Sequence, residues 1–115
     1  MQIQVNTSSQ VAGSDELTRL VEGTVEGAVH RFADRITRVE VHITDDNSSQ
    51  KGGPDDIRCQ MEVRLAGLQP ISVSHRSATI DLALDGAVQK LEKAIERTLG
   101  RREGAKGGRS AAGET

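Results

Sequence analysis

The order in which two hydrophobic periodicities alternate along the chain is the strongest constraint on its fold. Apolar residues recur at every second position in four stretches, residues 1–7, 36–44, 57–65 and 71–76. They recur at spacings of three and four over residues 17–32 and 80–99. A period of two is typical of a strand with one buried face, and spacings of three and four are typical of an amphipathic helix. The sequence therefore predicts the element order β-α-β-β-β-α.

The connections between these elements predict the topology. The first two strands are joined through a helix, which favours a parallel, right-handed crossover, whereas the later strands have no helix between them and should pair antiparallel. Each strand has one apolar face and each helix one apolar stripe, so both helices should cover the same side of the sheet. We expect an α+β two-layer sandwich with a four-stranded mixed sheet, both helices on one face and the other face in water.

Capping residues and glycines indicate where the helices begin and end. Ser14 is a predicted N-cap, with Asp15 and Glu16 in the first turn, where carboxylates favour the helix dipole. The first stripe consists of Leu17, Leu20, Val21, Val25, Ala28, Val29 and Phe32. The second helix should begin near residues 77–79 and end at Gly100. Residues 101–115 are rich in Gly, Ala and Arg without periodicity, so we expect a folded domain over 1–100 and a disordered tail over 101–115.

Composition excludes several classes of function. Phe32 is the only aromatic residue, so the core must be aliphatic and no platform of rings can stack nucleic-acid bases. No stretch approaches the roughly 20 apolar residues of a membrane helix, and the N-terminus lacks the pattern of a secretion signal. The single cysteine, Cys59, cannot form an internal disulfide, which favours a reducing compartment. We expect a cytoplasmic protein without a membrane partner.

The loop after residue 44 has partial calcium-site spacing. Asp45, Asn47, Ser49 and Asp56 stand at relative positions 1, 3, 5 and 12, as in a helix-loop-helix calcium loop. Position 6 is Gln50, where that loop needs glycine, and strands rather than helices are expected on either side. A solvated hairpin loop is the better interpretation.

No catalytic group can be assembled from the sequence. Cys59 is in phase with the apolar residues Ile57 and Met61, so it is expected to be a small core residue rather than a nucleophile or metal ligand. The three histidines, His30, His42 and His75, show no metal-ligand spacing with it. We expect a protein that is not an enzyme and uses no cofactor and no metal.

Basic side chains gather in the second half of the chain. Residues 1–57 carry a net charge of −5 and residues 58–115 a net charge of +3. Lys90, Lys93 and Arg97 share one face of the second helix and Arg101 follows them, while Arg31 and Arg35 lie near the end of the first helix. Glu92 and Glu96 stand close by. This pattern fits a polyanion-binding surface and a solvated helix face with local ion pairs equally well.

Three ordered segments resemble one known family. They are residues 31–43 (RFADRITRVEVHI), 57–67 (IRCQMEVRLAG) and 80–92 (IDLALDGAVQKLE). Together they are similar to the ribosome hibernation-promoting factor / ribosome-associated inhibitor family, also described as sigma-factor modulation proteins or ribosomal subunit interface proteins. The resemblance covers residues 1–100 and follows the element order derived above.

The resemblance implies a fold, a partner and a surface. Members have a fold like that of double-stranded-RNA-binding domains and occupy the mRNA and tRNA channel of the small ribosomal subunit, where they inhibit translation when growth slows. By position, the implied rRNA contacts are Arg31, Arg35, Lys90, Lys93, Arg97 and Arg101. We expect a member of the short form, without the additional C-terminal domain of the long members. Two questions stay open: whether the fold instead serves as a protein-interaction or regulatory module without rRNA affinity, and whether the chain forms a weak homodimer.

Overall fold

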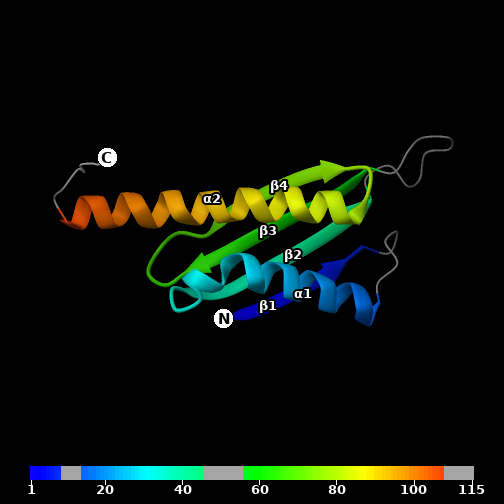
Figure 1. Cartoon of the computed structure of the whole chain (residues 1–115), viewed down its shortest axis with the longest axis horizontal. Coiled ribbons are helices and arrows are strands. Elements are labelled where there is room, and N and C mark those ends of the chain that lie inside the picture. The colour runs from blue at the N-terminus through cyan, green and yellow to red at the C-terminus, as the bar shows by residue number, and fades with distance from the viewer. Residues whose placement is uncertain (9–13, 46–55, 108–115) are drawn as a thin grey trace.

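The computed structural model describes residues 1–8, 14–45 and 56–107, with only the backbone described for 102–107, and has the predicted order of elements (Figure 1). The strands are β1 (Gln2–Thr7), β2 (Ile36–Asp45), β3 (Ile57–Leu65) and β4 (Ile71–Ser77). The helices are α1 (Asp15–Val29), a short 3-10 turn η1 (His30–Phe32) and α2 (Ile80–Gly107). The strands form one sheet in the order β1-β2-β3-β4.

The pairing of the strands confirms a mixed sheet. β1 is parallel to β2, with Val5 opposite Val41, and β2 is antiparallel to β3, with Val41 opposite Met61. β3 is antiparallel to β4, with Met61 opposite Val73. Because facing residues point to the same side of a sheet, this register lines up the apolar positions of all four strands on one face.

Both helices cover that face, as Figure 1 shows. The core between sheet and helices is aliphatic apart from one thiol and one thioether, and Phe32 only packs against its margin. Buried side chains come from every second residue of β2 and β3 and from one stripe of each helix; they include Val21, Val25, Val29, Val39, Val41, Ile43, Cys59, Met61, Val63, Leu84, Leu91 and Ile95. The predicted two-layer α+β sandwich is therefore confirmed.

The helix starts also follow the sequence prediction. The Ser14 hydroxyl accepts a hydrogen bond of 3.0 Å from the Leu17 amide, as an N-cap does. At the start of α2, the Thr79 hydroxyl accepts one of 3.2 Å from the Leu82 amide. These caps begin each helix where its apolar stripe begins.

The predicted end of the second helix was wrong. α2 continues through Gly100 to Gly107, so residues 101–107 are helical rather than part of a disordered tail; residues 108–115 lie outside the described range. A glycine ends a helix when it adopts a left-handed conformation, and among the described glycines only Gly67 does so (φ 76°). Within a helix, glycine costs only about 1 kcal/mol relative to alanine, which the helix-forming residues on either side can offset.

One residue of the predicted apolar stripe of α1 faces water. The Leu20 side chain is 47% exposed, whereas Val21 is fully buried. Leu20 lies about 100° from Val21 around the helix axis. The other buried residues of α1 lie on the opposite side of Val21 from Leu20. The stripe therefore excludes Leu20, although its spacing from Leu17 fits a helical pattern.

A close approach between β4 and α2 was not visible in the sequence. The His75 side chain lies on the helix-covered face, and its imidazole ring occupies the space where a Cβ atom at residue 86 would be placed. Gly86 is therefore required by contact between the two layers and not by its backbone conformation. A glycine within an amphipathic helix indicates this kind of contact only after the opposite residue is known.

We predict that Gly86→Ala lowers the free energy of unfolding by about 1–3 kcal/mol, because the added methyl group must displace the His75 ring. Chemical denaturation measures this loss. Gly100→Ala is the control, since no atom lies within 4 Å of a Cβ placed there. The combination with His75→Ala should recover most of the loss; a Gly86→Ala variant as stable as the Gly100→Ala variant would contradict the contact.

Candidate nucleic-acid interface

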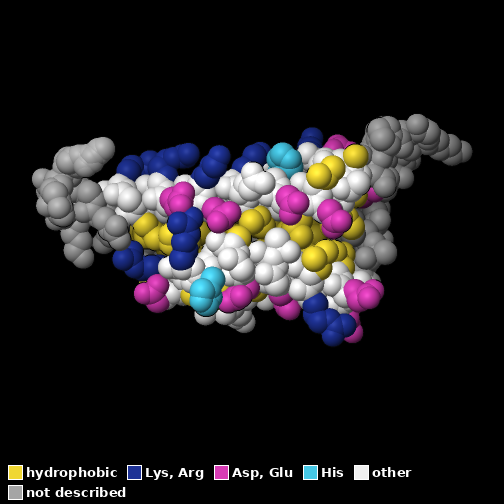
Figure 2. Space-filling model, viewed as in Figure 1, with side chains coloured by type: hydrophobic (Ala, Val, Ile, Leu, Met, Phe, Trp, Pro, Cys, Tyr) yellow, Lys and Arg dark blue, Asp and Glu magenta, His cyan; other side chains and the backbone are white. Residues whose placement is uncertain are grey.

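Four basic side chains form a line along α2. Lys90, Lys93, Arg97 and Arg101 follow one another at spacings of three and four residues and therefore share one face of the helix. All four are exposed. They lie on the side of α2 next to β4, where Figure 2 shows Lys and Arg along the upper edge of the molecule. We call these four residues the basic row.

The basic row is attached to the sheet at one point and is otherwise free to meet a ligand. The Lys90 ammonium donates a hydrogen bond of 2.8 Å to the main-chain carbonyl of Ser74 on β4. Among the side chains that the structure describes, no carboxylate lies within 4 Å of the charged groups of Lys93, Arg97 or Arg101. Their positive charge is therefore not neutralised by a described ion pair.

A line of acidic side chains follows the other side of the same helix. Asp81, Asp85, Glu92 and Glu96 are spaced four, seven and four residues apart, so they also share a face. This face borders α1, and Figure 2 shows Asp and Glu along it. We call these residues the acidic row. α2 thus carries opposite charges on its two exposed flanks, with the buried stripe beneath.

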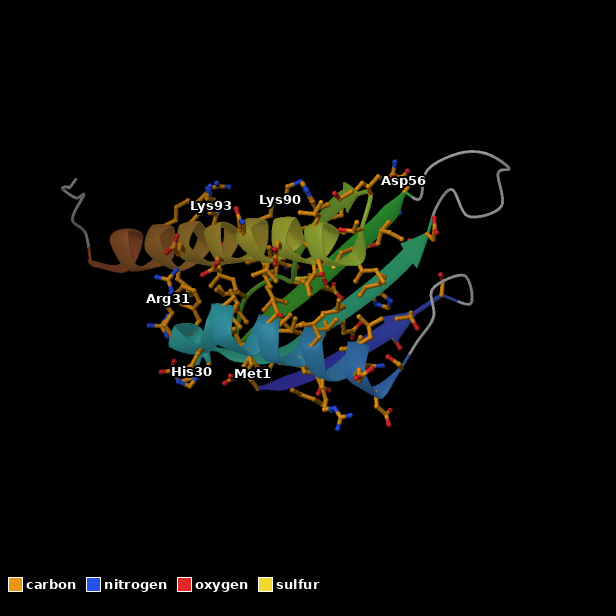
Figure 3. All side chains as sticks on the ribbon, turned by 45° about the vertical axis from the view of Figure 1, so that its right-hand side comes forward. Met1, His30, Arg31, Asp56, Lys90 and Lys93 are labelled. Atoms are coloured by element: carbon orange, nitrogen blue, oxygen red, sulfur yellow. The ribbon has the colours of Figure 1, made fainter. Side chains whose placement is uncertain are left out.

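Arg31 belongs to the acidic side. Its guanidinium lies 2.5 Å from a Glu96 carboxylate oxygen and 3.9 Å from one of Glu92. It also lies 4.5 Å from the centre of the Phe32 ring, a cation–π contact that fixes its orientation. Figure 3 shows Arg31 on the opposite side of α2 from Lys90 and Lys93.

Arg35 lies near Arg31 at the end of η1. Both arginines line a hollow of about 360 Å³ between η1 and the C-terminal half of α2, together with Phe32, Asp34, Glu96, Leu99 and Gly100. The Arg35 carbonyl accepts a backbone hydrogen bond from Ala66, which ties this corner to the end of β3. Arg35 thus lies at the same end of the molecule as the C-terminal turns of α2, which carry the last residues of the basic row.

The six residues singled out from the sequence therefore fall into two groups. The structure brings Lys90, Lys93, Arg97 and Arg101 into one line and places Arg31 and Arg35 on the other side of α2. The sequence showed that Glu92 and Glu96 were near, but not that Glu96 pairs with Arg31, 65 residues away. Helical spacing predicts contacts within one helix, and no periodicity predicts this pairing between elements.

The remaining chemical candidates are scattered over the molecule. His30 is exposed on η1 and pairs with Glu26, and His42 lies on the open face of the sheet. His75 is directly opposite Cys59, but its ring packs against Gly86. Cys59 is fully buried, and this burial raises the pKa of its thiol from 9.0 to about 12. The complete burial of Cys59 confirms its interpretation as a core residue, and the raised pKa keeps the thiol in its unreactive protonated form.

The described part of the chain contains neither a cluster of metal-ligating side chains nor a membrane-spanning helix. Among the described side chains of residues 1–8, 14–45 and 56–101, no three of His, Cys, Asp or Glu converge as metal ligands would. Most of the loop with calcium-like spacing, residues 46–55, lies outside the described part of the chain. No helix in the described part has the length and apolar character of a membrane span.

Two solved structures share this fold. One is a ribosomal subunit interface protein from Coxiella burnetii, with a TM-score of 0.70 and 20% identity over 87% of this chain and 99% of that chain. The other is the N-terminal domain of Protein Y from Thermus thermophilus, with a TM-score of 0.69 and 21% identity over 85% of this chain and 99% of that chain. At these identities the two matches establish the fold alone.

A family model for the Sigma 54 modulation protein / S30EA ribosomal protein matches residues 4–103. The chain belongs to this family, which confirms the resemblance to the ribosome hibernation-promoting factors and makes the protein a ribosome-associated factor. A search of the curated proteins finds no match.

The buried thiol of Cys59 predicts a pH dependence of stability. Above pH 9 the unfolded chain releases the thiol proton while the folded chain keeps it, so the free energy of unfolding should fall as the pH rises from about 9 to about 12. The slope attributable to this group approaches about 1.4 kcal/mol per pH unit. Urea denaturation at pH 8–11 should show this loss in the parent chain and a smaller one in Cys59→Ala. Equal slopes in both proteins would contradict the assignment.

Proposed function

We propose that this protein binds the rRNA of the small ribosomal subunit in the mRNA and tRNA channel and inhibits translation in the cytoplasm when growth slows. Family membership supports association with the ribosome, and the basic row supports RNA as the ligand. The observation that carries the proposal is that three of its four cations, on Lys93, Arg97 and Arg101, have no described carboxylate within 4 Å.

The geometry of the basic row suits a phosphate backbone. Eleven residues separate Lys90 from Arg101, which corresponds to about 16 Å along a helix axis. Long cationic side chains at this spacing can each neutralise a phosphate and release counterions. With a single aromatic residue in the chain, recognition would depend on the shape and charge of folded RNA and not on base stacking.

The acidic row gives the proposed complex an orientation. Asp81, Asp85, Glu92 and Glu96 repel phosphates on the α1 side of α2, which favours an approach of RNA to this helix from the β4 side or from the end of η1. A net charge of −2 for the chain is therefore compatible with RNA binding, because the two signs are separated on opposite flanks of one helix. Arg31 and Arg35 would contact rRNA from the η1 end.

The second candidate function is a protein-interaction or regulatory module of the same fold without rRNA affinity. The observation that favours it is the pairing of Arg31 with Glu96, which neutralises one of the six proposed contacts in the free protein. Co-sedimentation with small ribosomal subunits separates the two functions. Absence of the protein from the subunit pellet even at low salt would support the second.

We predict that Lys93→Glu with Arg97→Glu reduces affinity for small subunits by at least about tenfold at low salt. The salt dependence should also become shallower by about two in the slope of log K against log salt, because two phosphate contacts are lost. Lys90 is left intact because its hydrogen bond to the Ser74 carbonyl links α2 to the edge strand β4, and its loss could alter the fold as well as RNA binding. Pelleting assays over a range of salt concentrations measure both quantities.

The control for this variant is Arg19→Glu with Arg64→Glu. It changes the net charge equally, at exposed positions on α1 and on the open face of the sheet. It should leave the salt slope close to that of the parent chain. If both variants lose affinity to the same degree, the interaction responds to net charge, and the basic row is not the contact surface.

We also predict that Glu96→Gln strengthens RNA binding by up to about fivefold, since an exposed ion pair contributes up to about 1 kcal/mol and its loss frees Arg31. The same pelleting assay measures the change. Glu26→Gln is the matched control, because it removes an exposed carboxylate that pairs with His30 instead. An equal gain in both variants would assign the effect to net charge and not to Arg31.

A further inference from the structure

The two edges of the sheet differ in how they are protected. On the β4 edge, Pro70 directly precedes the strand and Lys90 donates to the Ser74 carbonyl, so a main-chain acceptor is already occupied. The β1 edge consists of Gln-Ile-Gln-Val-Asn-Thr and contains no charged residue and no proline. Its pairing with β2 is continuous from Gln2 to Thr7, without a bulge. Charges, prolines and bulges are the features that normally prevent a strand edge from pairing with another chain.

The outward groups of β1 can be identified from one hydrogen bond. The Ser8 amide donates a hydrogen bond of 3.0 Å to the Ile43 carbonyl of β2, so the main-chain N–H and C=O of residue 8 point toward β2. Because these groups alternate along a strand, those of Ile3, Val5 and Thr7 point away from the sheet. Among the described residues, no backbone hydrogen bond outside the regular ladder reaches these three. They offer three donors and three acceptors.

We propose that the β1 edge pairs antiparallel with β1 of a second copy of this chain, forming a symmetric homodimer with one continuous sheet. With Val5 on the two-fold axis, Ile3 of each copy lies opposite Thr7 of the other. This register makes every outward group of both strands part of a hydrogen-bonded pair, six bonds in total by the antiparallel pattern. It also places Gln4 opposite Asn6 on the open face, and each of these amides can both donate and accept.

The surface beside this edge is self-complementary in charge. A hollow between β1 and α1 is lined by Met1, Ile3, Arg19, Glu22, Gly23 and Glu26. The hollow contains both signs of charge and two apolar side chains. In a dimer with two-fold symmetry, Arg19 of one copy would therefore face the same hollow of the other copy, which contains carboxylates. A uniformly basic or uniformly acidic partner would meet like charges there. This is the argument for a second copy as the occupant.

The dimer is separate from the proposed RNA surface. β1 and β4 are the opposite edges of the sheet (Figure 1). The basic row lies beside β4, because Lys90 donates a hydrogen bond to the Ser74 carbonyl. Figure 3 likewise shows Met1 and Lys90 on opposite sides of the molecule. Pairing through β1 therefore leaves Lys90, Lys93, Arg97 and Arg101 exposed, and dimerisation and RNA binding can be tested independently.

Sedimentation velocity over a concentration series tests the proposal. The dimer interface involves one six-residue strand from each copy, so we expect a weak dimer with a dissociation constant of about 10 µM to 1 mM. The variant Gln4→Lys with Asn6→Lys places lysines opposite one another across the axis and should raise that constant at least about tenfold. Thr7→Pro removes an outward donor without removing a bond to β2, and it should weaken the dimer as well.

The matched control is Ser72→Lys with Ser74→Lys, which adds the same charge to exposed positions on the same sheet face at the β4 edge. It should dimerise like the parent chain, and circular dichroism verifies that each variant is folded. A parent chain that stays monomeric at about 1 mM would overturn the proposal. So would a dimer that survives both β1 variants, or one that the control weakens equally. If the β1 variants still bind small subunits, RNA binding does not depend on dimerisation, and the proposed function is tested separately from the dimer.

Discussion

One-sided burial of the sheet by two aliphatic helix stripes is the constraint on which the other features depend. With a single aromatic side chain, which only packs at the margin, the core is filled by Val, Ile, Leu and Ala, together with Met61 and Cys59. Small branched side chains fill the space between layers only when strands and helices approach closely, and the contact between the His75 ring and the Gly86 backbone is one place where they do. Among the side chains that the structure describes, no charged one is consequently buried in this core.

α2 shows how this constraint leads to function. Its buried stripe occupies less than half of its circumference, and the exposed remainder is divided between a basic flank next to β4 and an acidic flank next to α1. Separation of the two signs gives the molecule a local positive surface despite its net charge of −2. The Arg31–Glu96 pair adds a second effect, because it holds one cation on the acidic side in the free protein.

The same layer arrangement leaves the two sheet edges unequal. α2 lies close enough to β4 for Lys90 to reach the Ser74 carbonyl, whereas β1 keeps the outward groups of Ile3, Val5 and Thr7. An edge strand without charge or proline is rare in a protein that must stay dispersed, unless something pairs with it. The proposed dimer and the proposed RNA surface thus arise at opposite edges of one sheet.

Periodicity in the sequence determined the elements, their order, the mixed topology and the face of each strand that is buried, because these follow from local patterns and from the short connections between them. It also determined that Lys90, Lys93 and Arg97 share a face, since they lie on one helix, whereas Arg101 joins that face only because α2 continues past Gly100. Only the tertiary structure decided which flank of α2 meets β4 and which meets α1, that Arg31 pairs with Glu96, and that Gly86 receives the His75 ring. It also showed that α2 continues past Gly100. The first three of these depend on the packing of elements distant in sequence, and the last depends on whether Gly100 adopts a left-handed backbone, which its residue type permits but does not require.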